Sequence, residues 1–131
     1  MKEVNIDFQR LKDNYLQKIE FKKDGQIVML TFRSVVNDKA NILKLINCLA
    51  FKDLGIFDFP IEAVLIRKPG HFFREYCNKK GIDFNLYYQL EILPKGFIKK
   101  DGDEVEYRTF FALFENIEFL SSIDGEEDFW W

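Results

Sequence analysis

The chain has 131 residues, of which 47% are hydrophobic and 31% charged, and its formal net charge is −3. This length and apolar content predict a single globular domain, residues 1–131, with a core of its own, and exclude a disordered chain. The longest uninterrupted apolar run, residues 110–114, is too short to cross a bilayer. The mildly acidic balance argues against nucleic acid as a partner, since nucleic-acid binding selects a basic face.

The N-terminal segment and the two cysteines indicate the compartment. Residues 1–7 carry charges where an export signal requires an apolar segment, so we expect a cytoplasmic protein. Cys48 and Cys77 are too few for a disulfide scaffold, and each has apolar neighbours in sequence. We therefore expect both thiols to be buried and reduced.

A short helix and a hairpin are predicted first along the chain. Asn5 is a suitable N-cap, and Phe8, Leu11 and Tyr15 fall on one face of a helix ending near residue 16. Beyond it, apolar and polar residues alternate on both sides of Asp24-Gly25, a dipeptide that accepts positive φ. The alternation predicts two antiparallel strands closed by this turn.

A third strand, a loop and a short fourth strand follow. Residues 41–51 have apolar side chains at alternate positions, which predicts an extended segment. Residues 52–60 contain Gly55 and Pro60, which indicate a loop, and residues 62–67 form the short strand. The loop is expected to lie on the core through its apolar residues, which are Ile56, Phe57 and Phe59.

A helix of about ten residues is predicted next, with signals at both ends. Pro69 suits the first helical position, Lys79-Lys80 suits the last turn, and Gly81 suits the residue after the end. We expect the helix to pack on the sheet through one apolar side, formed by Phe72, Phe73, Tyr76 and Cys77.

The clearest period of two in the chain covers residues 84–92. It predicts a strand with one buried face, formed by Phe84, Leu86, Tyr88, Leu90 and Ile92. A turn is expected at residues 94–96. A second hairpin, closed by Asp101-Gly102, then joins residues 97–98 to the segment that follows.

Residues 104–119 are the densest apolar and aromatic segment, and we expect the rest of the fold to be organised around it. As a strand, its more apolar face carries Val105, Tyr107, Thr109, Phe111, Leu113, Ile117 and Phe119. The opposite face is apolar only in the middle, at Phe110, Ala112 and Phe114. The alternative is a helix from Phe110 onward, since several apolar residues there also follow helical spacing. Aromatic enrichment favours the strand.

A weak repeat predicts bends in the strands. Ser34, Asn47 and Asn116 each precede an apolar residue that is out of phase with the alternation before it. A small polar side chain can bond to the backbone there while the strand redirects its side chains. The sequence thus predicts a mostly β (α+β) fold: a curled antiparallel sheet or sandwich of about six to eight strands with two short helices. We expect one shared core that includes Leu86, Tyr88, Leu90, Phe111 and Leu113.

The sequence offers few groups for catalysis or metal binding. His71 is the only histidine, and helical spacing pairs it with Glu75 rather than with Cys77. No Gly-x-Gly spacing occurs, which argues against the usual phosphate-binding loops. Residues 101–104 resemble the start of a calcium loop but lack its later ligands. We therefore expect no catalytic residues, no cofactor and no metal site, with an enzyme of unrecognised type as an alternative.

Two acidic segments that also contain aromatic residues form the candidate site. Aromatic side chains supply buried area to a protein interface, and nearby acids steer a basic partner. The alternative is that the terminal tryptophans pack on their own domain. The candidate partner-binding residues are Asp101, Asp103, Glu104, Tyr107, Asp124, Glu126, Glu127, Asp128, Phe129, Trp130 and Trp131.

In size, mild acidity, lack of a catalytic set and strands such as Phe-Glu-Asn-Ile-Glu-Phe at 114–119, the chain resembles small single-domain immunity proteins that bacteria pair with polymorphic toxins. The resemblance covers the whole length and assigns no individual residue. It implies a non-enzymatic protein that neutralises a cognate toxin by binding to it. The alternative, from another class, is a β domain that holds an apolar small molecule between its sheet and its helix.

Overall fold

The computed structural model describes residues 8–22, 26–34, 39–57, 59–95, 99–100, 103–104 and 109–121. Within them the chain is mostly β, as predicted, with eight strands in two four-stranded antiparallel sheets. The first sheet contains, in spatial order, β1 (Asn14–Lys22), β2 (Ile27–Ser34), β3 (Ala40–Ile46) and β10 (Asn116–Ser121). The second contains β4 (Ala50–Asp53), β9 (Phe110–Phe114), β6 (Tyr88–Pro94) and β5 (Ile61–Arg67).

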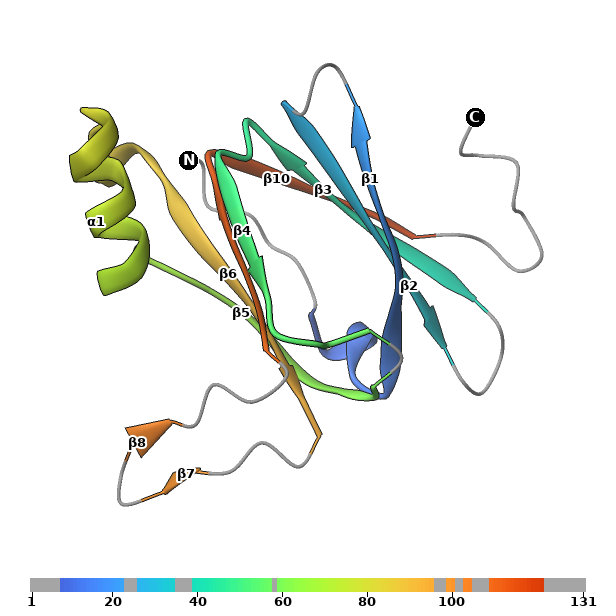
Figure 1. The fold of residues 1–131 in the computed structure, drawn as a ribbon. Coiled ribbons are helices and arrows are strands. Elements are labelled where there is room, and N and C mark those ends of the chain that lie inside the picture. The colour runs from blue at the N-terminus through green and yellow to red at the C-terminus, as the bar shows by residue number, and fades with distance from the viewer. Residues whose placement is uncertain are drawn as a thin grey trace.

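The two sheets form two layers, and α1 (His71–Lys80) lies against the outer face of the second sheet (Figure 1). The main core fills the space between the sheets and includes Leu30, Phe32, Leu43, Leu90 and Phe110. A second, smaller apolar cluster joins the second sheet to α1, and its buried members are Phe73, Cys77, Tyr87 and Leu113. The second sheet is therefore buried on both faces where α1 covers it.

The aromatic segment at 110–119 is extended, so the helical alternative is wrong. Strands β9 and β10 are separated only by Glu115, where the chain passes from the second sheet to the first. The middle of this segment is covered on both faces, as expected: Phe110 and Phe114 belong to the main core, whereas Leu113 belongs to the α1 cluster.

A second crossing corrects the prediction of one strand over residues 41–51. Strand β3 ends at Ile46 in the first sheet, and β4 begins at Ala50 in the second. Between them Asn47 has a left-handed backbone with a φ of 54°, which asparagine tolerates better than most residues. The bends predicted near Asn47 and Asn116 therefore occur, but they carry the chain between sheets instead of curling one sheet.

The predicted N-terminal helix is wrong. Phe8–Leu11 form only a 3-10 turn, and β1 already begins at Asn14. Asp13 has a φ of 70°, and its amide donates a 2.9 Å hydrogen bond to the carbonyl of Ile61. This contact directs the chain into the sheet before a helix can continue. Asn5, the proposed cap, lies outside the described residues.

Both predicted Asp-Gly hairpins are confirmed by the strands on either side of the turns. Lys22 of β1 is opposite Ile27 of β2. Lys100 of β7 (Lys99–Lys100) is likewise opposite Asp103 of β8 (Asp103–Glu104). The four turn residues themselves, 24–25 and 101–102, lie outside the described part of the chain.

The helix predicted after residue 69 is confirmed, with two corrections. It begins at His71, with Gly70 as its N-cap, so Pro69 precedes the helix instead of opening it. It ends at Lys80, and Gly81 follows as the predicted cap, with a φ of 69° that favours glycine. One member of the predicted apolar side, Phe72, is 56% exposed.

The loop after β4 lies on the core, as predicted, although one aromatic residue does not. The Asp53 carboxylate accepts hydrogen bonds from the amides of Gly55 at 2.8 Å and Ile56 at 3.2 Å, which shapes the turn. Ile56 is fully buried, and Phe57 packs against the main core. Phe59, however, is exposed.

The strand predicted over residues 84–92 begins later than expected. Phe84–Leu86 form a 3-10 turn, and the carboxylate of Asp83 accepts a 3.0 Å hydrogen bond from the amide of Asn85. This cap holds the turn out of the sheet, so β6 starts only at Tyr88. Leu86 is consequently 58% exposed.

The expected shared core is split between two clusters. Leu90 is fully buried in the main core, and Tyr88 packs against it. Leu113 lies in the α1 cluster, and Phe111 packs there. Leu86 belongs to neither, so its predicted place in the core is wrong.

Candidate functional site

The predicted partner-binding patch lies outside the residues whose side chains the structure describes. For Asp103 and Glu104 only the backbone is described, as strand β8. The members that are not described are Asp101, Tyr107, Asp124, Glu126, Glu127, Asp128, Phe129, Trp130 and Trp131. The patch stays a prediction, and the described residues form a different site.

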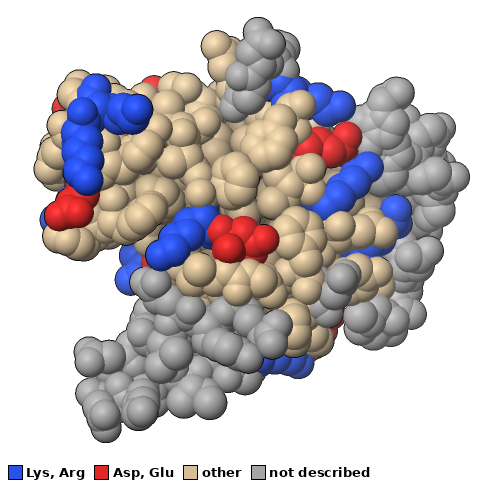
Figure 2. Space-filling model, viewed as in Figure 1, with Lys and Arg blue, Asp and Glu red and all other residues tan. Residues whose placement is uncertain are grey.

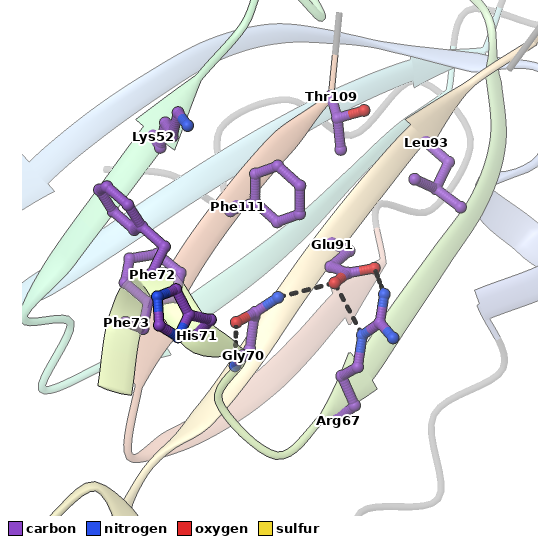
Figure 3. A pocket seen from close by; sticks show the side chains of 11 residues that line it. Lys52, Arg67, Gly70, His71, Phe72, Phe73, Glu91, Leu93, Thr109 and Phe111 are labelled. Carbon is purple, nitrogen blue, oxygen red and sulfur yellow. Dashed lines mark hydrogen bonds and ion pairs between the residues drawn. The ribbon is translucent and has the colours of Figure 1, made fainter. Parts of the chain in front are cut away.

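One row of side chains crosses the outer face of the second sheet. Leu65 of β5 is opposite Glu91 of β6, and Glu91 is opposite Phe111 of β9. Phe111 is in turn opposite Lys52 of β4. Side chains paired in this way point to the same face of a sheet. The row therefore places a carboxylate and an ammonium group on either side of one aromatic ring (Figure 3).

A cleft of about 420 Å³ lies over this row, between the sheet and the first turn of α1 (Figure 3). The sheet side of the lining consists of Lys52, Arg67, Gln89, Glu91, Leu93, Thr109 and Phe111. The helix side consists of Gly70, His71, Phe72 and Phe73. Apolar rings and charged groups thus line one cavity.

A polar network runs along one side of the cleft. Arg67 Nε donates to Glu91 Oε1 at 2.7 Å, and Arg67 Nη2 donates to Glu91 Oε2. Gln89 Nε2 also donates to Glu91 Oε1, at 2.6 Å, and Gln89 Oε1 accepts from the Gly70 amide at 2.7 Å. A β-carbon at Gly70 would lie 3.3 Å from that amide oxygen, so the close approach favours glycine. The network ties β5 and β6 to the start of α1.

The two charges of this network differ in their exposure. The Glu91 side chain is 2% exposed, whereas that of Arg67 is 50% exposed. A buried carboxylate requires both a charged partner and hydrogen bonds, and the two-pronged contact with Arg67 supplies both. The part of this network that reaches solvent is therefore mainly the Arg67 side chain.

Aromatic and cationic groups form the other side of the cleft. Lys52 Nζ lies 4.8 Å from the centroid of the Phe72 ring, a distance at which the ring face attracts a cation. The ring of Phe72 meets that of Phe73 edge to face at 5.3 Å. His71 pairs with Glu75 at 3.2 Å, as predicted from their spacing, and both side chains are exposed. The first turn of α1, the Phe72 ring and the Lys52 ammonium group thus form one wall of the cleft.

The two cysteines are poor nucleophiles. Both are free thiols. Burial raises the pKa of the Cys48 thiol to about 11, with a smaller opposing effect from its contact with the Ala50 carbonyl. Burial also raises the pKa of Cys77, and the nearby Asp83 carboxylate adds to that shift. Both thiols are therefore protonated at neutral pH.

An exposed aromatic pair is the second surface feature of interest. Phe21 of β1 is 54% exposed and Phe51 of β4 is 44% exposed, although their ring centroids are only 5.5 Å apart. The Phe51 ring also stacks on buried Phe110 at 5.9 Å. The pair lies where the edge strands of the two sheets approach each other. Its inner ring is held by the core, and its outer ring faces solvent.

Sequence reasoning missed the network of Arg67, Gln89 and Glu91. Gln89 and Glu91 occupy the polar positions of the strand at 84–92, which suggested a face open to solvent. The sequence nevertheless contained a signal for this network, because a helix was also predicted to pack on the sheet. A glutamate on a covered face needs a cation, and Arg67 ends the strand next to it.

Charge on the described surface is mixed. Figure 2 shows positive and negative side chains interspersed among broad uncharged areas on the face viewed in Figure 1. Among the described residues, no helix has the length and apolar character that crossing a membrane requires. The same part of the chain contains no group of three or more His, Cys, Asp or Glu residues that could hold a metal ion.

Comparison with protein-family models, with curated proteins and with solved structures finds no significant match to this chain. The described residues define its class by architecture alone: mostly β, with two four-stranded antiparallel sheets, the small β7–β8 pair and α1 on the outer face of the second sheet.

Proposed function

We propose that the protein binds a small organic molecule in the cleft between α1 and the outer face of the second sheet. The observation that carries this proposal is the network of Arg67, Gln89 and Glu91 beside an open cavity with aromatic walls. Small-molecule sites typically occupy about 300 to 1,000 Å³ and combine apolar surface with a few fixed polar groups. The cleft has both properties.

The cleft favours a ligand with an apolar body and at least one polar group. Phe72, Phe111 and Leu93 supply apolar contacts, whereas Lys52 and Arg67 supply charge within the same lining. A purely apolar molecule would displace water from these two charged side chains, which costs desolvation energy. The ligand would thus lie where the sequence analysis expected one, between the sheet and the helix. It would carry a polar group, whereas the sequence analysis expected an apolar molecule.

Phe72→Ala is expected to weaken the binding of a neutral aromatic probe by about tenfold. The loss of a contacting ring face of about 60 Å² is worth about 1.5 kcal/mol at roughly 25 cal/mol per Å². The measurement is a fluorescence titration with N-phenyl-1-naphthylamine, whose emission rises in apolar surroundings. Phe72 is 56% exposed, so its replacement should leave the fold intact.

Phe21→Ala is the matched control for this titration. It removes an equally exposed phenylalanine, at 54%, that does not line the cleft. The proposal requires saturable binding of one probe per chain that Phe21→Ala leaves unchanged. Absence of saturable binding, or equal losses in the two variants, would contradict it.

Protein binding is a second candidate function, favoured by the exposed pair of Phe21 and Phe51. Aromatic rings held at one side by a core lose little side-chain entropy when a partner buries them, which is a property of interface hot spots. This candidate agrees with the expectation of an immunity protein that covers a toxin. Its partner would bind where the two sheets approach each other.

For this candidate, Phe21→Ala should weaken partner binding by about 30-fold, because a hot-spot ring contributes about 2 kcal/mol. The measurement is calorimetric titration with the product of a toxin gene adjacent to the gene of this protein. Phe72→Ala serves as the control and should retain full affinity. If Phe21→Ala bound the partner as tightly as the unmodified protein, the pair of Phe21 and Phe51 would not belong to the interface.

A further inference from the structure

We propose that residues 122–131, which follow β10 in the chain, dock on the outer face of the first sheet through Phe129, Trp130 and Trp131. These residues lie outside the described part of the chain, and the sheet itself indicates where they bind. The docking corresponds to the alternative drawn from the sequence, in which the two tryptophans pack on their own domain. It is separate from the cleft, which lies on the second sheet.

The outer face of the first sheet contains many apolar residues. Val28, Leu30 and Phe32 of β2 point into the main core, so the residues between them point outward. Charged side chains such as Lys44 and Glu118 share this outer face. The outward residues that are apolar, together with Thr31, are Ile27, Met29, Thr31, Ile42, Ile46 and Leu120. An antiparallel sheet usually carries polar residues on a face that meets water, so this composition favours a covering layer.

Two side chains at the centre of this face are buried although they point outward. Thr31 of β2 is 1% exposed, and Ile42, opposite it on β3, is fully buried. Among the described residues, no helix or strand lies over them (Figure 1). The second sheet provides the contrast: Leu113 is fully buried in the α1 cluster, whereas Leu65, outside that cluster, is 41% exposed. Complete burial on the first sheet therefore indicates a cover from outside the described residues.

The hydroxyl of Thr31 supports the same conclusion. Its Oγ1 atom is buried and has no hydrogen-bond partner among the described residues. On an open face of the sheet, water would reach this atom and bond to it. Buried hydroxyl groups almost always have a partner, so we expect the covering segment to supply one. An indole N–H or a backbone group of residues 122–131 can do so.

Position identifies residues 122–131 as the cover. Strand β10 is an edge strand of the first sheet, and its Leu120 is opposite Ile42, so the segment begins beside the buried pair. From β10 to β2 are two strand spacings, about 10 Å. Ten extended residues span about 33 Å, so the segment can cross the whole sheet.

Composition supports the same choice. Residues 122–131 contain Phe129 and both tryptophans of the sequence, and such rings bury large apolar areas. The other segments outside the described residues that adjoin β1, β2 and β3, residues 23–25 and 35–38, contain no aromatic side chain. Residues 1–7 contain none either, and they lead into the 3-10 turn that contacts β5 of the second sheet.

Tryptophan fluorescence tests the docking directly, because Trp130 and Trp131 are the only tryptophans of the 131 residues. Burial of an indole moves its emission to shorter wavelength and shields it from the quencher acrylamide. We expect both effects in the folded chain, measured against the same chain unfolded in urea. The emission should not depend on protein concentration. A shift that grows with concentration would assign the cover to a second copy and overturn the proposal.

Thr31→Asp should release the segment. Aspartate is close to threonine in size, but docking must desolvate its carboxylate, so the docking equilibrium should fall by at least about tenfold. The emission should then move toward that of the unfolded chain, and quenching should increase. Thr31→Val adds no charge and should leave the emission unchanged. Leu65→Asp, which introduces the same charge on the second sheet, should also leave it unchanged.

A measurement without substitutions locates the segment independently. We expect nuclear Overhauser contacts between the indole protons of Trp130 or Trp131 and the methyl groups of Ile42. The absence of such contacts from the assigned spectrum of the folded chain would overturn the proposal. Emission typical of water-exposed tryptophan in the folded chain, or equal shifts in Thr31→Asp and Leu65→Asp, would overturn it as well.

Discussion

Replacing Leu90 with alanine is expected to lower the free energy of unfolding by about 2 to 5 kcal/mol. Leu90 is fully buried in the main core, on β6 between Ile66 of β5 and Ala112 of β9. Neighbouring strands on both sides are held by backbone hydrogen bonds, so they cannot close the space that the lost side chain leaves. The cost therefore includes a cavity term as well as the lost transfer energy. Urea unfolding followed by circular dichroism measures it.

Leu86→Ala is the internal control for this measurement. It deletes the same atoms four residues earlier, at a position that is 58% exposed. The expected change is below about 0.5 kcal/mol, as for other surface positions. If the two substitutions cost the same, the 3-10 turn at Phe84–Leu86 does not hold Leu86 out of the core.

The contrast between these two leucines shows what a period of two can predict. Leu86 and Leu90 have the same parity in one alternating segment, so the sequence placed both on a buried face. The structure separates them because Asp83 caps a turn, a local hydrogen bond that competes with strand pairing. Other features that depend on local sequence, the two Asp-Gly hairpins and the glycine after the helix, were predicted correctly.

Features decided by tertiary packing were less accessible. The polar residue at Asn47 was recognised as a bend, but nothing local states that β3 and β4 belong to different sheets. In the same way, Phe111 and Leu113 were assigned to the principal buried face, and the structure places the larger core on the side of Phe110 and Phe114. Both faces of that strand are apolar, so alternation alone could not decide between them.

The site was harder to predict than the fold for a related reason. Sequence reasoning searched for groups that are unusual in composition, and so it selected the acidic and aromatic segments near residues 101 and 124. Glu91 is an ordinary glutamate until the helix covers its face of the sheet and Arg67 reaches it from the next strand. Its role depends on β5, α1 and β6 coming together in the fold.

Arg67→Met is expected to destabilise the protein by about 3 kcal/mol, the lower end of the range for breaking a buried ion pair. The lower end applies because Arg67 is half exposed, so water can partly replace it beside Glu91. The methionine keeps the length of the side chain but leaves the buried carboxylate with only the Gln89 amide as a described donor. Chemical unfolding at neutral pH measures the loss.

The opposite substitution should be milder, and this asymmetry tests the arrangement of charges. Glu91→Leu leaves a guanidinium that can rehydrate, so we expect a loss of about 1 kcal/mol, mainly from the hydrogen bond to Gln89. The double variant, Arg67→Met with Glu91→Leu, should recover most of the stability, because no buried charge is left without a partner.

A surface ion pair provides the reference for these Arg67 and Glu91 variants. Lys12 and Glu62 lie 3.4 Å apart with side chains that are 46% and 48% exposed, and Lys12→Met should cost less than about 1 kcal/mol. A loss for Arg67→Met no larger than that for Lys12→Met would mean that Glu91 is hydrated. In that case the network would not order the start of α1, and the wall of the cleft that carries Phe72 would lose its support.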